Sequence, residues 1–335
     1  MKTILVILLS ISFLPPATAK PVQVQQLVVG DKFVLSSDAT KPVVVTSETG
    51  AIYALRLRNG KYKLAAINVP SAEITERMPD MLPDGIVSAG MANLKRVWLS
   101  APTRRYDHGI LGDVIEASAV SAELAGGQIV VYQLPDEAVF EDLKARLVDL
   151  DGNGQQQILV VRSWLDRGAA PVILSVENGS LGLTASAAPI GRSHRWLNPV
   201  GVADFDGDGI PEIAAIVTPH IGGTLQLYHR VGDRLITGLS ASGFSNHRIG
   251  SRNLDLSAIA DINGDGVADI VSPDASHRNL LAVTFRDGQY REIFRVPLTE
   301  AIMSAILVTD FDQNGRPELV MATDRGTLLV LTPAP

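Results

Sequence analysis

A nine-residue pattern recurs four times in the second half of the chain and constrains its fold more than any other feature. Three strong copies begin at Asp204, Asp261 and Asp310, and a weaker copy begins at Asp149. Oxygen-bearing side chains occupy positions 1, 3, 5 and 9, and glycine occupies position 6. A glycine-centred turn that gathers several oxygens suits a hard cation, and calcium prefers this ligand set. The pattern therefore predicts both metal sites and a repeating architecture.

Each copy lies inside a larger unit that recurs every 49 to 57 residues. Short apolar runs precede and follow the pattern, and a hairpin-like pair of runs comes next, around turn signals such as Asn178-Gly179 and Asp287-Gly288. Each unit is therefore predicted to form four short antiparallel strands. Such a unit cannot bury both faces alone, and radial packing of these units makes a β-propeller.

The first half of the chain predicts two further units that lack the metal pattern. Their strands are expected at residues 43–45, 52–57 and 62–67, and then at 97–100, 114–117 and 129–134. The last unit stops after 327–331, and residues 22–29 and 32–35 are expected to complete it and to close the ring. The chain thus predicts an all-β propeller of six four-stranded blades, or seven if residues 51–127 divide differently. Residues 68–83 are interpreted as an insertion with a short helix at 72–78.

The N-terminus has the features of a secretory signal peptide. Lys2 precedes an apolar run at 4–14, and Ala17-Thr18-Ala19 offers a cleavage site, so residues 1–19 are expected to be removed. The run is too short to span a bilayer, and we expect a single domain at 20–335 that does not cross a membrane. The predicted location is the periplasm or the medium, and the predicted state is a monomer.

Composition narrows the function. The chain has no cysteine, so disulfides are excluded, and bound metal is a plausible alternative stabiliser for an exported protein. The net charge of −7, together with export, argues against nucleic-acid binding. No nucleophile elbow, zinc-binding helix motif, glycine-rich phosphate loop or cysteine nucleophile is found in the sequence.

The loops and their strand spacing resemble FG-GAP/VCBS-type repeats, which build integrin α-chain propellers and occur in many exported bacterial proteins. The resemblance covers roughly residues 140–335. It implies calcium in the loop between the first and second strands of a blade, bound by side chains at positions 1, 3, 5 and 9 and by the carbonyl at position 7. The implied ligands are Asp204, Asp206, Asp208, Ile210 and Glu212, then Asp261, Asn263, Asp265, Val267 and Asp269, then Asp310, Asp312, Asn314, Arg316 and Glu318.

The weaker copy departs from this pattern. It offers Asp149, Asp151, Asn153 and Gln155, but Gln157 cannot supply the carboxylate expected at position 9. The resemblance therefore implies three calcium sites and a fourth that is weaker or empty. An EF-hand is excluded, because its acid stands at position 12 and helices flank its loop. An Asp/Gly-rich turn without metal remains the alternative.

Arginine and histidine gather in the loops expected on the face opposite the metal. The candidate ligand-binding residues are His194, Arg195, His220, His247, Arg248, Arg252, His277 and Arg278. Arginine binds carboxylates, sulfates and phosphates through its planar fork. We therefore expect a non-catalytic protein that binds an envelope protein or an anionic glycan there. The alternatives are an exported polysaccharide-active lyase or hydrolase, and loops in which these residues only tie blades together.

Overall fold

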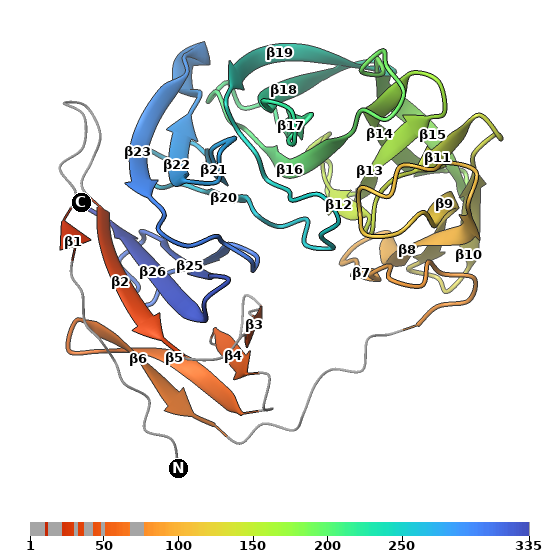
Figure 1. Ribbon diagram of the computed structural model, residues 1–335. Coiled ribbons are helices and arrows are strands. Elements are labelled where there is room, and N and C mark those ends of the chain that lie inside the picture. The colour runs from red at the N-terminus through yellow and green to blue at the C-terminus, as the bar shows by residue number, and fades with distance from the viewer. Residues whose placement is uncertain are drawn as a thin grey trace.

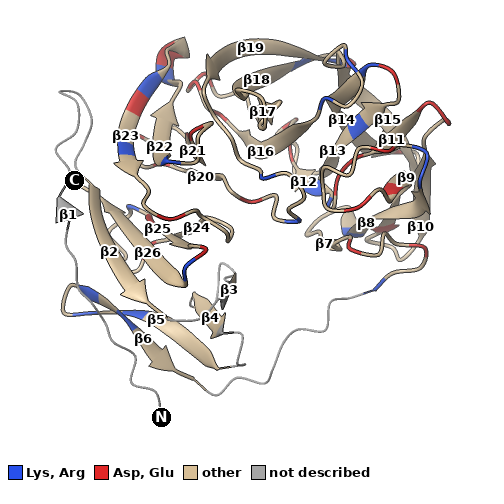
Figure 2. Cartoon of the chain, viewed as in Figure 1, with Lys and Arg blue, Asp and Glu red and all other residues tan. Residues whose placement is uncertain are grey.

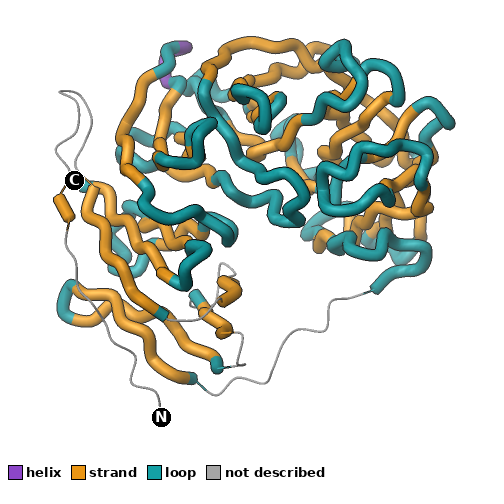
Figure 3. Tube along the Cα trace, viewed as in Figure 1, coloured by secondary structure: helices purple, strands orange, loops and turns teal. Residues whose placement is uncertain are grey.

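The described chain is built from β-strands. The computed structural model describes residues 11–12, 22–29, 33–36, 43–47, 51–67 and 77–334. Their one helical element is the 3-10 turn η1 (Arg286–Gly288), which joins two strands (Figures 1 and 3). No helix in these ranges has the length and apolar character needed to span a bilayer. The predicted all-β class is confirmed.

Most strands belong to four-stranded units in which consecutive strands pair antiparallel. The first unit contains β3 (Phe33–Ser36), β4 (Val44–Ser47), β5 (Ile52–Arg58) and β6 (Lys61–Ala66). The second contains β7 (Ser88–Ala89), β8 (Leu94–Thr103), β9 (Glu116–Leu124) and β10 (Ile129–Gln133). The third contains β12 (Arg146–Val148), β13 (Gln157–Trp164), β14 (Gly168–Glu177) and β15 (Ser180–Ala187).

The units that carry the strong metal patterns follow. The fourth contains β16 (Leu197–Ala203), β17 (Glu212–Val217), β18 (Thr224–Val231) and β19 (Arg234–Ser242). The fifth contains β20 (Ala258–Ala260), β21 (Asp269–Pro273), β22 (Asn279–Thr284) and β23 (Arg291–Pro297). The strand β11 (Ala138–Phe140) bridges β9 and β13, and β15 pairs with β19, so the second, third and fourth units form one continuous 13-stranded sheet.

The sixth unit joins both ends of the chain. It contains β24 (Leu307–Thr309), β25 (Glu318–Ala322) and β26 (Thr327–Pro333), and β2 (Val22–Val28) pairs antiparallel along β26. The two-residue strand β1 (Ile11–Ser12) lies beside β2. The expectation that residues 22–29 complete the last unit is met by β2, and the closure of the ring stays a prediction. The expectation for 32–35 is wrong, because β2 already covers the edge of β26 and β3 pairs with β4.

Alternating side chains bind each unit to the next. In β17, Ile213 and Ala215 enter the buried cluster shared with the third unit, whereas Ala214 and Ile216 enter the cluster shared with the fifth. Successive side chains of a strand point to opposite faces, so one short strand serves two cores. Among the described residues, five such clusters join the units in the order second, third, fourth, fifth, sixth and first.

The units follow one another along an arc in the same order (Figure 1). Strands in the middle of a unit, such as β21 and β25, are buried along their whole length, because neighbouring units cover both faces. Charged residues lie mainly along loops and exposed hairpins, while β2, β16 and β26 carry none (Figure 2). The predicted hairpin turns are also found, with left-handed φ angles at both Asn178 (51°) and Gly179 (75°).

Two interpretations of the sequence fall largely outside the described residues. Of the expected signal peptide at 1–19, the structure describes Ile11 and Ser12. Of the helix expected at 72–78, it describes Arg77 and Met78, which are not helical.

Candidate metal centre

All four nine-residue patterns occupy the same place in their units. Position 1 follows the first strand directly, and position 9 is the first residue of the second strand: Gln157 in β13, Glu212 in β17, Asp269 in β21 and Glu318 in β25. Each pattern thus forms the loop between the first and second strands, as the resemblance implies. We name these loops by their first residues: the Asp149, Asp204, Asp261 and Asp310 loops.

Shared hydrogen bonds fold the four loops alike. The position 1 carboxylate accepts from the N–H of the position 6 glycine at 2.8, 2.9, 2.8 and 2.8 Å, in chain order. The position 5 side chain accepts from the N–H of position 7, which is Gln155, Ile210, Val267 or Arg316, at 2.8, 2.7, 3.0 and 2.8 Å. The position 6 glycines have φ between 78° and 88°, a region that suits glycine.

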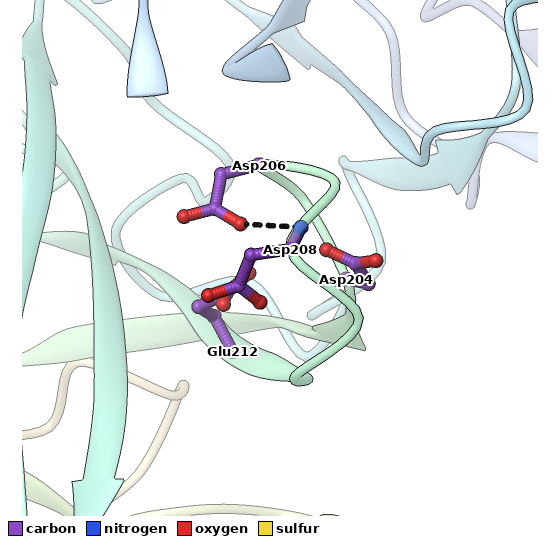
Figure 4. Close-up of side chains that lie close together, drawn as sticks. All are labelled: Asp204, Asp206, Asp208 and Glu212. Atoms are coloured by element: carbon purple, nitrogen blue, oxygen red, sulfur yellow. Dashed lines mark hydrogen bonds between the residues drawn. The ribbon is translucent and has the colours of Figure 1, made fainter. Parts of the chain in front are cut away.

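The Asp204 loop brings four carboxylates together. Oxygen atoms of Asp204, Asp206, Asp208 and Glu212 all lie within 4.8 Å of one another (Figure 4). Asp206 also accepts a hydrogen bond of 3.1 Å from the backbone N–H of Asp208. In the described part of the chain, this is the one group of three or more acidic or histidine side chains that converges closely enough to hold a metal ion. The loop therefore has the donor set of a calcium site.

Glu212 is the buried position 9 residue of this loop. Its side chain is fully buried, and Oε2 accepts a hydrogen bond of 2.9 Å from the N–H of Phe205. Oε1 is buried and has no hydrogen-bond partner in the described residues, although Nδ1 of His229 lies 3.5 Å away. Burial first, with help from the neighbouring aspartates, raises the pKa of Glu212 to about 7, against the hydrogen bond from Phe205. A divalent cation would bind Oε1 and offset the repulsion.

The Asp261 and Asp310 loops repeat this arrangement with fewer acids. Asp269 and Glu318 are buried, and each accepts a 2.9 Å hydrogen bond from the N–H at position 2. Burial raises the pKa of Asp269 to about 7 and also raises the pKa of Glu318. Asp265 is paired as well, because Arg286 donates to its backbone oxygen at 2.8 Å and lies 3.2 Å from its carboxylate. These carboxylates do not converge as closely as those of the Asp204 loop.

In the Asp149 loop, side chains of the protein donate hydrogen bonds to the Asp151 carboxylate. The amide nitrogen of Gln157 donates to Asp151 Oδ2 at 2.8 Å. Nη1 of Arg230, which lies on β18 of the next unit, donates to both oxygens of Asp151, at 2.9 and 3.2 Å. Sequence reasoning missed Arg230, since no local pattern links residues 79 positions apart.

The histidines proposed as ligand-binding residues contact neighbouring loops, and two of them contact each other. His247 is fully buried, and its Nδ1 lies 3.0 Å from His220 Nε2, while its Nε2 lies 2.9 Å from the carbonyl oxygen of Ser251. His277 hydrogen-bonds with Ser245 at 2.9 Å. The ring of His194 stacks on Tyr106, with centroids 5.1 Å apart. These contacts join loops of different units.

The arginines proposed as ligand-binding residues differ in their exposure and in their hydrogen-bond partners. Arg252 is exposed and pairs with Asp84 and Asp113 at 2.8 and 2.9 Å. Arg195 donates to the carbonyl oxygen of His194 at 2.9 Å. Arg278 is exposed. Arg248 is half-buried, and its Nε has no acceptor among the described residues.

A buried acid–base group lies near these loops and was missed. The buried carboxylate of Glu141 hydrogen-bonds with Nδ1 of His108 and with the hydroxyl of Ser163. Because Phe140 pairs with Ala117, Glu141 stands opposite Glu116 on β9. Burial and then the Glu141 carboxylate raise the pKa of Glu116 to about 10. No local sequence pattern predicts this group, because His108, Glu141 and Ser163 are far apart in the sequence.

Comparison with known proteins agrees with the loop geometry. A family model described as FG-GAP-like repeat matches residues 149–215 and 261–321. The two matched segments contain all four metal-pattern loops. No curated protein matches the chain. The sequence match and the shared geometry of the loops together show that the chain contains FG-GAP-like repeats in these two segments.

Proposed function

We propose that the protein is an exported, calcium-stabilised β-propeller of six blades that binds a partner without catalysis. The observation that carries the metal assignment is the convergence of four carboxylates within 4.8 Å in the Asp204 loop. The Asp261 and Asp310 loops share its hydrogen bonds, which supports two further sites. The propeller is supported by five buried clusters that link the six units in order. Export is supported by the expected signal peptide at 1–19.

Calcium binding is tested by isothermal titration calorimetry on the metal-free protein, together with calorimetric melting in calcium and in EDTA. We expect about three ions per chain and a melting temperature that EDTA lowers by several degrees, because each ion binds only the folded loop. Magnesium at the same concentration is the control, since it demands a stricter octahedral geometry. An unchanged melting temperature and no binding heat would remove calcium from the proposal.

The proposed partner is an anionic glycan that binds on the face opposite the metal loops. Arg162, at the end of β13, and Arg248, between β19 and β20, both have a buried Nε without an acceptor in the described residues. Arg162 also lies over the ring of Trp164, with its guanidinium carbon 4.2 Å from the ring centroid. Carboxylate or sulfate groups of a glycan would supply acceptors, and Trp164 offers an apolar surface to a sugar ring.

Glycan binding is tested with polyuronate and sulfated oligosaccharides in a calorimetric titration. Arg162→Gln and Arg248→Gln should each weaken binding at least tenfold, because each removes a charged donor. Arg234→Gln, on an exposed strand near the opposite end of its unit, should leave the affinity unchanged. Capture of an envelope protein by parent but not by these variants, without glycan binding, would replace the glycan with a protein partner.

A second candidate function is cleavage of an acidic polysaccharide. The observation that favours it is the hydrogen bond between His108 and the buried carboxylate of Glu141, an arrangement that orients an imidazole for proton transfer. Incubation with polyuronates should then release reducing ends, and His108→Ala should abolish the release while leaving the melting temperature within a few degrees of the parent. Absence of products from the parent would leave the non-catalytic proposal.

A further inference from the structure

The position 9 side chain separates the Asp149 loop from the other three. In every loop one atom of this side chain accepts from the N–H of position 2: Gln157 Oε1 from Leu150 at 2.8 Å, and Glu212 Oε2 from Phe205 at 2.9 Å. In the Asp149 and Asp204 loops the other atom lies beside the acidic side chains of the loop. In Glu212 that atom is an oxygen without a hydrogen-bond partner among the described residues, and in Gln157 it is an amide nitrogen that donates to Asp151 at 2.8 Å. An amide N–H cannot be a ligand to a cation.

Arg230 supplies the positive charge that this loop needs. It comes from the end of β18 in the fourth unit, and its Nη1 donates to both oxygens of Asp151. Its Nε donates to the carbonyl oxygen of Gly232 at 3.1 Å, which holds the side chain beside its own hairpin. The side chains of Arg230 and Asp151 are only 23% and 40% exposed. The guanidinium therefore has a fixed place in the loop.

The Asp149 and Asp204 loops also differ in the balance of their acidic and basic groups. The Asp149 loop carries two carboxylates, and one arginine and one amide donor satisfy the second of them. The Asp204 loop carries four carboxylates, and the nearest basic group in contact is His229, 3.5 Å from Glu212. We infer that the Asp149 loop is a metal-free version of the repeat, in which Arg230 of the next unit and the Gln157 amide take the place of calcium. The proposed calcium binding by the other three loops sets the number of ions expected in the test. The inference rests on the proposed function only in that respect.

Four proteins test the inference: the parent, Arg230→Met, the double variant Gln157→Glu/Arg230→Met, and the control Arg234→Met. Arg234 is an exposed arginine of the same hairpin. Calcium stoichiometry is measured by equilibrium dialysis, and melting temperatures are measured in EDTA and in calcium. Arg230→Met should lower the melting temperature by about 1–3 °C, equally in both conditions and without changing the stoichiometry. Arg234→Met should change it by less than about 1 °C.

The double variant provides the gain-of-function arm. It restores a carboxylate at position 9 and removes the competing cation, so it should bind one calcium ion more than the parent. In EDTA the double variant should melt at a lower temperature than the parent, and calcium should restore its melting temperature. The inference is overturned if Asp149→Asn removes one ion from the parent, or if calcium alone restores Arg230→Met. If the parent binds no calcium but Arg230→Met is equally destabilised in both conditions, the proposed function fails and the arginine substitution stands.

Discussion

At the scale of single residues, the chemistry of position 9 decides how a loop is stabilised. Glu212 and Gln157 have nearly the same shape and accept the same backbone hydrogen bond, yet one presents an oxygen to the loop interior and the other an N–H. Burial makes the difference large, because a buried charge without a partner costs several kcal/mol of folding free energy. On the proposed assignment, position 9 separates the loops that bind a cation from the Asp149 loop, which supplies its own donors.

Replacing Glu212 with glutamine should remove the ion from the Asp204 loop. We expect the variant to bind one calcium ion fewer and to lose about 2–3 kcal/mol of unfolding free energy when calcium is 100-fold above its dissociation constant. In EDTA the variant should be as stable as the parent or more stable, because a buried carboxylate has been neutralised. Urea unfolding in both conditions measures the effect, and an equal loss in EDTA would contradict it.

The buried histidine pair should make stability depend on pH. Burial first, and then the neighbouring histidines His247, His108 and His277, lower the pKa of His220 to about 4, and burial lowers the pKa of His247 to about 4. Between pH 6.5 and about 4 the unfolded chain binds protons that the folded pair refuses, so the unfolding free energy falls as the pH falls through this window. Burial and then the charge of Arg248 also lower the pKa of His277, which changes the unfolding free energy in the same direction.

The comparison that isolates this pair is made in EDTA, where calcium release does not contribute. Urea unfolding at pH 7.5, 6 and 5 should show a shallower loss of stability in His220→Gln/His247→Asn than in the parent. The raised pKa of Glu116 makes the unfolding free energy fall as the pH rises from the ordinary range of a glutamate to about 10. Glu116 is present in both proteins, so this contribution cancels in the comparison. Identical slopes would show that the pair is already protonated or is not buried in solution.

At the scale of strands, periodicity and turn residues predicted most of the fold. The apolar runs and the Asn-Gly and Asp-Gly turns located most strands of the six units, because both signals are local. The short strands β7 and β11 were not predicted. The partner of a strand is not a local property. The sequence therefore could not distinguish β2, which pairs with β26, from β3, which pairs with β4. The Glu141–His108 contact and the Arg230–Asp151 contact were missed for the same reason.

The packing of β2 can be tested with two adjacent residues. Leu27 is 1% exposed and belongs to the cluster between the sixth and first units, whereas Val28 is 37% exposed. Leu27→Ala should cost about 2–4 kcal/mol of unfolding free energy, since it leaves a cavity in a closely packed cluster. Val28→Ala should cost less than about 1 kcal/mol. Equal effects in urea unfolding would show that β2 does not pack on β26 in solution.

At the scale of the whole molecule, metal ions change the overall charge as well as the local stability. The chain has a formal charge of −7, and three calcium ions would reduce it to −1. A protein close to neutrality is less repelled by an anionic ligand, so calcium would favour binding on the opposite face. The metal loops were predictable because each is a continuous segment. The opposite face was not, since its hydrogen bonds join loops that are distant in the sequence.

Electrophoresis under native conditions measures this change directly. Migration toward the anode should be slower in calcium than in EDTA, and the isoelectric point should rise from its metal-free value near 5.4. Asp204→Asn/Glu212→Gln, which weakens one site, should shift less on addition of calcium than the parent does. Equal mobility of the parent in calcium and EDTA would contradict the proposed ion count.

The pairing of β2 with β26 sets an order of events during biosynthesis. A ribosome makes β2 before the other five units and β26 after them, so the sixth unit stays incomplete until β26 has been made. Until then β2 lacks the strand along which it pairs. For the proposed export, a fold that cannot finish before β26 has been made would keep the chain in the unfolded form that a secretion channel accepts.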